Sequence, residues 1–424
     1  MFAKLAAALK IPDIRNKILS IAFLLVVFRI FAAIPIPGID AVRLREFLGS
    51  NQLLGFLNVF SGGTLSNLSI MMLGVGPYIT ATIIMQLLTM IFPNLKVIYY
   101  EEGAQGRAKF NRISRYITVP LAGLQAYGFL NLLRSQGVLP ALDVFEIMRN
   151  VIIIMTGTMI LVWIGELITE KKIGNGTSLI IFAGIVSALP QAVRTAVLSY
   201  DVAMLPTYIA FVVMSIIVIA GVVFVNQGER KVPVAYSKRV RGNKVYGGSM
   251  SYLPLRVNQA GVIPIIFAIS ILLFPQFLAQ IVSVVSTDLS VRLNDLVAGL
   301  LNNQLIYGIS YFVLVVVFTY FYTAVTFDPK EIAKNLQRSG GFIPGIRPGE
   351  PSGDFLSKLV NRVTLFGAMF LGLIAVLPII TQSITGIATL TIGGTALLIV
   401  VSVALETMQQ LEAQLTMREY EGME

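Results

Sequence analysis

The sequence predicts an all-α integral membrane protein of ten transmembrane helices, on three observations. The 424 residues are 56% hydrophobic and only 13% charged, whereas soluble domains are about 45–50% apolar and about 25% charged. Ten mainly uncharged runs have about the 20 residues that a helix needs to cross a bilayer. Basic residues gather in alternate connections, which is typical of a chain that crosses a membrane repeatedly.

The predicted spans cover most of the chain in regular succession. They lie at 18–36, 70–92, 116–136, 147–168, 178–199, 206–226, 257–281, 304–326, 363–381 and 388–406. If the N-terminus is inside, 25 of the 32 Lys and Arg residues fall in the two tails and in the connections after spans two, four, six and eight. The positive-inside rule therefore predicts a multi-pass protein with both termini in the cytoplasm.

The composition argues against an enzyme. The sequence has no Cys and no His, which excludes thiol nucleophiles and Cys/His zinc sites and removes the commonest general base. The spans also lack paired carboxylates and nucleotide-binding loops. We expect no catalytic residue, no metal and no cofactor.

Two regions depart from a simple series of spans. Residues 47–95 contain no charge but are interrupted by several glycines, so we expect a short helix at 55–70 that does not cross, followed by a true span. Such a segment is tolerated at membrane depth when it lines a cavity. The inside loops 227–256 and 327–362 are long and basic. In the first loop, alternating apolar residues around Arg241-Gly242-Asn243 predict a β-hairpin.

Short motifs recur five spans apart. Gly74–Ile79 and Gly261–Ile266 share Gly-Val-x-Pro-x-Ile, and 176–181 and 394–399 share Gly-Thr-x-Leu-x-Ile. A duplicated unit of five helices must insert its second copy upside down, which places the functional path between the halves. We therefore predict an N-terminal half at 1–200 and a C-terminal half at 201–424.

The motifs place isoleucine and valine near the middle of spans two, five, seven and ten. Isoleucine on a membrane helix normally faces lipid or packs against a neighbour. The alternative is a hydrophobic constriction, which closes a pore without a charged filter. Spacing alone leaves both interpretations open.

The chain resembles the SecY family, the central channel subunits of bacterial protein translocation, over essentially its whole length. The resemblance rests on motifs that occur in the same order, at 72–88, 102–107, 174–186, 257–264 and 333–349. It implies two inverted halves around an hourglass pore with a ring of aliphatic side chains: Val75, Ile79, Ile181, Ile185, Ile266 and Ile399. Position 75 is Val where many relatives have Ile.

The resemblance also assigns the plug, the gate and the docking surfaces. The segment 55–70 matches a plug that fills the outer funnel, and its central residues are Phe60, Ser61, Gly62, Gly63, Thr64, Leu65, Ser66, Asn67 and Leu68. Polar candidates at a lateral gate between spans 2–3 and 7–8 are Thr82, Gln125 and Asn258. The residues expected to dock cytoplasmic partners are Arg239, Arg241, Lys244 and Arg347.

The function implied is a protein-conducting channel of the cytoplasmic membrane, which exports unfolded preproteins and releases apolar segments sideways into the lipid bilayer. Its implied partners are SecE-like and SecG-like subunits, the SecA motor, the ribosome with its RNA, and the signal sequence of a preprotein. Two alternatives compete with this hypothesis. An ion-coupled secondary transporter also suits an inverted repeat but predicts a midplane ionisable cluster, which the spans lack. The other alternative is a scaffold that conducts nothing.

Overall fold

The computed structural model describes most of the chain. The described residues are 10–37, 61, 63–65, 68–100, 102–135, 137, 139, 143–198, 205–236, 239–241, 244–246, 250–282, 292–293, 299, 303–385 and 393–421. The structural statements below refer to these residues.

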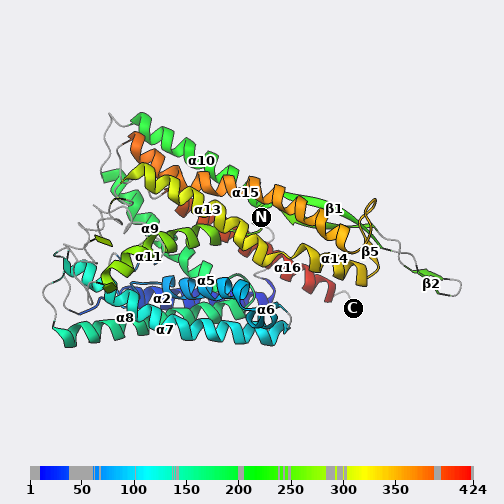
Figure 1. Cartoon of the computed structure of the whole chain (residues 1–424). Helices are drawn as coiled ribbons and strands as arrows, with labels where there is room; N and C mark the ends of the chain where they lie inside the picture. The colour runs from blue at the N-terminus through cyan, green and yellow to red at the C-terminus, as the bar shows by residue number, and fades with distance from the viewer. Residues whose placement is uncertain are drawn as a thin grey trace.

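Each of the ten predicted spans overlaps one helix (Figure 1), which confirms the ten-helix layout. These helices are α2 (Pro12–Ala32), α5 (Gly76–Ile91), α7 (Gly103–Ser135), α8 (Val144–Glu170), α9 (Gly176–Leu198), α10 (Leu205–Gln227), α11 (Ile263–Val282), α13 (Gln304–Thr326), α15 (Glu350–Thr385) and α16 (Gly393–Glu421). Two shorter helices join them, α6 (Pro93–Tyr100) and α14 (Pro329–Arg338).

Length and apolar composition alone identify fewer spans than packing does. Five described helical segments are long and apolar enough to cross a membrane: Val144–Glu170, Tyr208–Gln227, Gln304–Arg338, Glu350–Thr381 and Ala396–Met417. The pair α5 and α6, bent by 115°, would add a sixth. The shorter apolar helices α9 and α11 pack against α8 and α13, which are long enough to cross. The bundle therefore includes helices that length and apolar composition alone do not identify as membrane spans.

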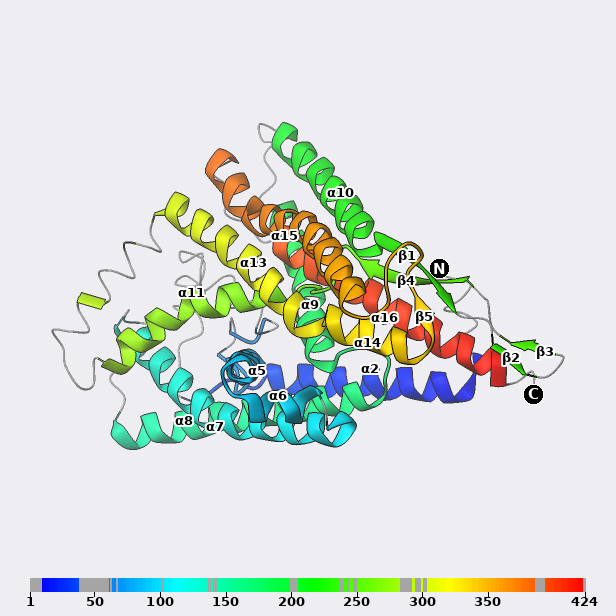
Figure 2. The same cartoon turned by 45° about the vertical axis from the view of Figure 1, so that its right-hand side comes forward.

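The helices form two groups that meet along two seams (Figures 1 and 2). In one group α7 packs against α5 and α8, and in the other α15 packs against α13 and α16. At one seam α11 contacts α5 and α7, and at the other α9 contacts α16. A large apolar cluster runs through both groups. The centre of the molecule is therefore a contact between segments far apart in the sequence.

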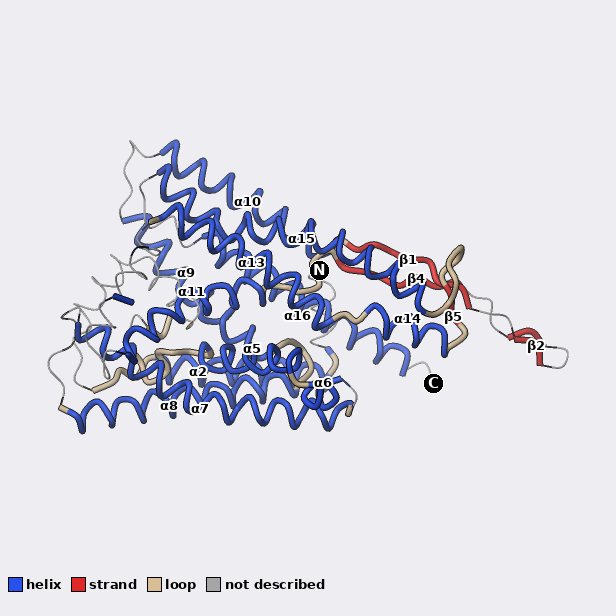
Figure 3. The backbone as a smooth tube through the Cα atoms, viewed as in Figure 1, coloured by secondary structure: helices blue, strands red, loops and turns tan. Residues whose placement is uncertain are grey.

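The two long basic loops fold together at one end of the molecule, where β1 and β4 run beside α15 (Figure 3). Strand β1 (Glu229–Tyr236) pairs antiparallel with β4 (Met250–Arg256) and with β5 (Gly341–Phe342). The buried residues Val232, Leu255 and Ile343 share a small core with the first turns of α15. The loops 227–256 and 327–362 are thus one packed platform.

The predicted hairpin is present at the tip of the first loop. Strand β2 (Arg239–Arg241) pairs with β3 (Lys244–Tyr246), and Arg241 lies opposite Lys244. Two residues connect the strands, as expected of the commonest hairpin turns.

The short helix predicted at 55–70 is not found in the part of that segment that the structure describes. Residues 61, 63–65 and 68–70 form turns and one bridge, Pro35 to Ser69. The Thr64 hydroxyl donates to the carbonyl oxygens of Ser61 and Met71, each at 2.8 Å, and these side-chain bonds compete with helix formation. Of the predicted plug residues, Phe60, Gly62, Ser66 and Asn67 lie outside the described residues.

Candidate functional site

The start of α5 is set by glycine and proline. Gly74 has a φ of +57°, a left-handed conformation that glycine adopts without a steric penalty. Pro77 lies in the first turn, where a missing N–H costs no hydrogen bond. The first turn closes when the amide of Ile79 donates to the Val75 carbonyl oxygen at 3.0 Å. The span therefore begins at Gly76, six residues later than predicted.

The start of α11 repeats this local structure. Gly261 has a φ of +61°, Pro264 again lies in the first turn, and the Ile266 amide donates to the Val262 carbonyl oxygen at 3.4 Å. The same six-residue motif therefore adopts one conformation twice. It places Val75 and Ile79 at one helix start and Ile266 at the corresponding position of the other.

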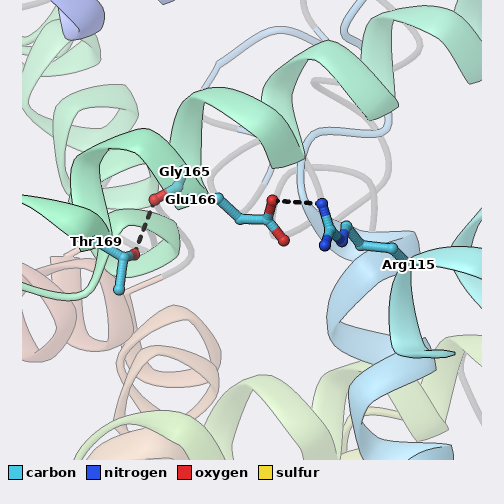
Figure 4. A network of polar contacts seen from close by, with 4 residues as sticks. All are labelled: Arg115, Gly165, Glu166 and Thr169. Carbon is cyan, nitrogen blue, oxygen red and sulfur yellow. Dashed lines mark hydrogen bonds and ion pairs between the residues drawn. The ribbon is translucent and has the colours of Figure 1, made fainter. Parts of the chain in front are cut away.

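A close approach between α8 and α9 positions the third helix. The Gly176 amide donates to the Thr169 hydroxyl at 2.9 Å, and that hydroxyl donates to the Gly165 carbonyl oxygen at 2.8 Å (Figure 4). A Cβ at Gly176 would lie 1.8 Å from the same carbonyl oxygen. Only glycine fits there. The contact fixes α9, which carries Ile181 and Ile185.

The six predicted ring residues come together in one apolar cluster. Val75, Ile181, Ile185, Ile266 and Ile399 are 1–7% exposed, and Ile79 packs against them partly buried. Val75 lies directly before α5, and the other five come from α5, α9, α11 and α16, which belong to both groups. These side chains therefore pack inside the protein rather than face lipid. The cluster contains many other apolar residues, so burial alone does not single out the six.

The three polar gate candidates occupy different environments. Thr82 donates to the Tyr78 carbonyl oxygen of its own helix at 2.9 Å, and Gln125 is half-buried on α7. Asn258 is 7% exposed and lies just before α11, which contacts the helices of both other candidates. Its amide nitrogen bonds to Asn226 of α10 at 2.7 Å.

Sequence reasoning missed two polar contacts. Asn226 donates to Ser402 of α16 at 2.7 Å; its one sequence signal is an amide near the end of an otherwise apolar span. Arg115 of α7 and Glu166 of α8 form an ion pair at 3.0 Å (Figure 4). Glu166 lies near the end of α8 and links two neighbouring helices.

The predicted docking residues lie on or beside the basic platform. Arg239, Arg241 and Lys244 fall in the β2–β3 hairpin. Arg347 is exposed in the connection between β5 and α15, and its carbonyl oxygen accepts from the Ser352 hydroxyl at 2.8 Å. That bond ties the Arg347 backbone to the first turn of α15.

A multi-pass helical membrane protein whose two helix groups close on a central apolar contact has the fold of a channel, and solved channels share it. A structure described as "The structure of a protein conducting channel" superposes with a TM-score of 0.60 at 20% identity, covering 93% of this chain and 91% of that one. Sec61 in the canine ribosome-channel complex gives 0.58 at 19% identity, with the same coverage.

Sequence comparison defines the family. The SecY family model matches residues 69–408. The protein translocase subunit SecY of Streptomyces galbus is 41% identical over 100% of this chain and 99% of its own length. The corresponding subunit of Thermus thermophilus is 42% identical over 98% of this chain and 96% of its own length. The chain belongs to the SecY family.

We predict that Gly176→Ala destabilises the protein, because the new methyl group would collide with the Gly165 carbonyl oxygen. Overpacking of this kind costs about 1–3 kcal/mol, and the midpoint of thermal unfolding in detergent should fall. Gly123→Ala on α7 is the control, since its Cβ would meet only the Met155 sulfur, at 3.8 Å. Equal midpoints for the two variants would contradict the close approach.

Proposed function

We propose that this chain is a protein-conducting channel, which passes unfolded preproteins across the cytoplasmic membrane and releases apolar segments into it. The observation that carries the proposal is that six branched side chains from both helix groups lie in one apolar cluster, five of them buried and Ile79 partly buried. A charged residue costs about 2.5–3.5 kcal/mol at the centre of a membrane helix. A polar polypeptide therefore needs a path across the membrane that keeps it out of the lipid. The translocase names of the family's members support this function.

The six aliphatic residues act as the seal of the closed channel. Branched alkyl groups make no hydrogen bonds, so they exclude ions without selecting for the sequence of a passing chain. They come from both proposed halves, 1–200 and 201–424. Moving the halves apart would therefore separate Ile266 and Ile399 from the four residues of the N-terminal half, which opens the ring.

The segment around residues 60–68 acts as the plug. In support, Ser61 lies directly against the start of α5, since a Cβ on Gly74 would approach the Ser61 Cα to 2.7 Å. Backbone bonds join Ile36 to Leu68 and Ile70 to Ile34, at 2.9 and 3.0 Å. The segment is thus tied to the end of α2 next to the ring residue Val75.

The lateral gate lies where α5 and α7 meet α11. In support, α11 contacts α5 and α7. Thr82 lies on α5, Gln125 on α7 and Asn258 just before α11. The other seam joins α9 and α16. An apolar segment of about 20 residues gains free energy by partitioning into lipid. A channel that opens along this seam would therefore sort apolar from polar segments.

The basic platform serves as the cytoplasmic docking surface for the ribosome and for the SecA motor. Its support is the concentration of Arg and Lys in the two joined loops, which favours RNA and acidic protein surfaces. One structural neighbour is described as part of a ribosome-channel complex. Both termini then face the cytoplasm, in agreement with the positive-inside distribution of Lys and Arg. SecE-like and SecG-like subunits would complete the assembly.

We predict that Ile399→Asn loosens the seal, because an amide in the ring attracts water where Ile399 is 1% exposed. Vesicles that contain the variant should leak ions at rest, and preproteins with weakened signal sequences should cross more readily. Conductance and translocation are measured on the same vesicles. Ile399→Leu, which keeps an apolar side chain of similar volume, should behave like the unaltered protein.

Three other results would contradict either the role of Ile399 in the seal or the channel function itself. Unchanged leak and unchanged signal stringency in Ile399→Asn would remove Ile399 from the seal. If the unaltered protein moves no preprotein, even with its partners, the channel function itself fails. Accumulation of a small solute driven by an ion gradient would favour a transporter.

We predict that Arg347→Glu impairs SecA-driven export while the protein still inserts into the membrane normally. The charge reversal would repel an acidic docking surface, and the exposed side chain leaves the fold unchanged. SecA-stimulated translocation into vesicles is compared with Arg338→Glu, an exposed arginine at the end of α14. Normal translocation by Arg347→Glu, or equal loss in both variants, would refute a specific role for Arg347.

A further inference from the structure

The connection between β5 and α15, which carries Arg347, sits on a closely packed frame. The strand β5 and the helices α14 and α15 lie together at one end of the molecule (Figure 1), and α14 contacts both of the others. The two helices approach so closely that a Cβ on Gly353 of α15 would lie 3.3 Å from the Lys330 Cα of α14. The first turn of α15 is therefore a fixed support for the connection before it.

The chain is anchored directly before Arg347. Ile343 is 3% exposed in the small core of the platform, and the Ile346 side chain packs partly buried against the same core. The Ile346 amide donates to the Ile343 carbonyl oxygen at 3.0 Å. Arg347 itself is exposed. The chain therefore leaves the core at the residue before the arginine.

The chain after Arg347 is held by one buried side chain. Ser352, in the first turn of α15, is 3% exposed. Its amide donates to the Gly349 carbonyl oxygen at 3.1 Å, and its hydroxyl donates to the Arg347 carbonyl oxygen at 2.8 Å. Gly349 has a φ of +97°, which glycine adopts without a steric penalty. A single serine thus binds both ends of the segment Arg347-Pro348-Gly349.

Pro348 makes the hydroxyl bond difficult to replace. Proline has no backbone N–H, so the peptide group between Arg347 and Pro348 has one hydrogen-bonding atom, the Arg347 carbonyl oxygen. The Ser352 hydroxyl binds that atom. The bond to the Gly349 carbonyl acts two peptide groups further along the chain. The hydroxyl therefore restrains the backbone at the point from which the arginine side chain projects.

We propose that Ser352 is a positioning residue for docking of the SecA motor, because its hydroxyl holds the Arg347 backbone in one orientation before the motor binds. This inference rests on the proposed docking role of Arg347. Ser352 is buried, so it acts through the arginine rather than by contact with the partner. A preorganised surface loses less conformational entropy on binding. Loss of the hydroxyl therefore weakens docking and leaves the later steps of export unchanged.

The test measures preprotein translocation at increasing SecA concentration, in vesicles that contain the full channel complex. Ser352→Ala should raise the SecA concentration for half-maximal translocation about fivefold, the factor that corresponds to about 1 kcal/mol for one hydrogen bond at 25 °C. The rate at saturating SecA should stay within about twofold of that of the unaltered protein. Ser352→Thr keeps a hydroxyl and should retain the normal half-maximal concentration.

Two controls separate positioning from a general effect on the platform. Ser339→Ala removes the hydroxyl of an exposed serine after α14, which donates to the Asn335 carbonyl oxygen at 3.0 Å, and it should change nothing. Arg347→Ala should raise the half-maximal SecA concentration by itself. Adding Ser352→Ala to Arg347→Ala should raise it no further, because both changes act through one side chain.

The other outcomes refute either the positioning role or the docking role. If Ser352→Ala has the same effect with and without Arg347, or if Ser352→Thr behaves like Ser352→Ala, the positioning role is wrong. A lower saturating rate at an unchanged half-maximal concentration would also refute it. If Arg347→Ala leaves the half-maximal concentration unchanged, the docking role of Arg347 fails. If Arg347→Ala raises that concentration and Ser352→Ala does not, only the positioning role fails.

Discussion

Packing of branched alkyl side chains between two groups of helices is the constraint on which this structure depends. Hydrocarbon offers no partner to a polar backbone, so each span must be helical. The centre must exclude water and yet remain separable. Aliphatic contacts satisfy both needs, because they are dense when closed and break no hydrogen bond when they part. Val75, Ile181 and Ile399 are each 1% exposed within the apolar cluster that runs through both groups.

The two helix starts at Gly74 and Gly261 explain how the aliphatic residues reach the centre. In each case a left-handed glycine turns the chain, and a proline in the first turn begins a helix at that point. The duplicated motif thus acts through backbone geometry as well as through its isoleucine. The difference lies in the surroundings: Ser61 lies against Gly74, whereas a Cβ on Gly261 would meet nothing within 4 Å.

Polar groups inside the bundle have a different role from the aliphatic contact. Arg115 and Glu166 join α7 to α8 within one group, and the bonds among Asn226, Asn258 and Ser402 stay within the other. These polar links strengthen each group internally. The groups themselves share the large apolar cluster, and they are also linked by Gln414 of α16, which accepts from Lys17 of α2 at 3.2 Å and donates to the Lys172 carbonyl oxygen at 2.6 Å.

The six aliphatic residues of the proposed ring were assigned by the resemblance to the SecY family, because spacing alone left their role open. The sequence by itself determined the ten spans and the hairpin around Arg241 and Lys244. These signals are local: runs of apolar residues, turn chemistry and short repeats. Tertiary structure decided that residues 61–75 form turns where the structure describes them, because Thr64 bonds to Met71 and Ile36 bonds to Leu68. It also decided the pairing of β1 with β5 and the contact between Asn226 and Ser402, 176 residues apart. Such contacts leave no local pattern, because their partners meet only after the helices have packed.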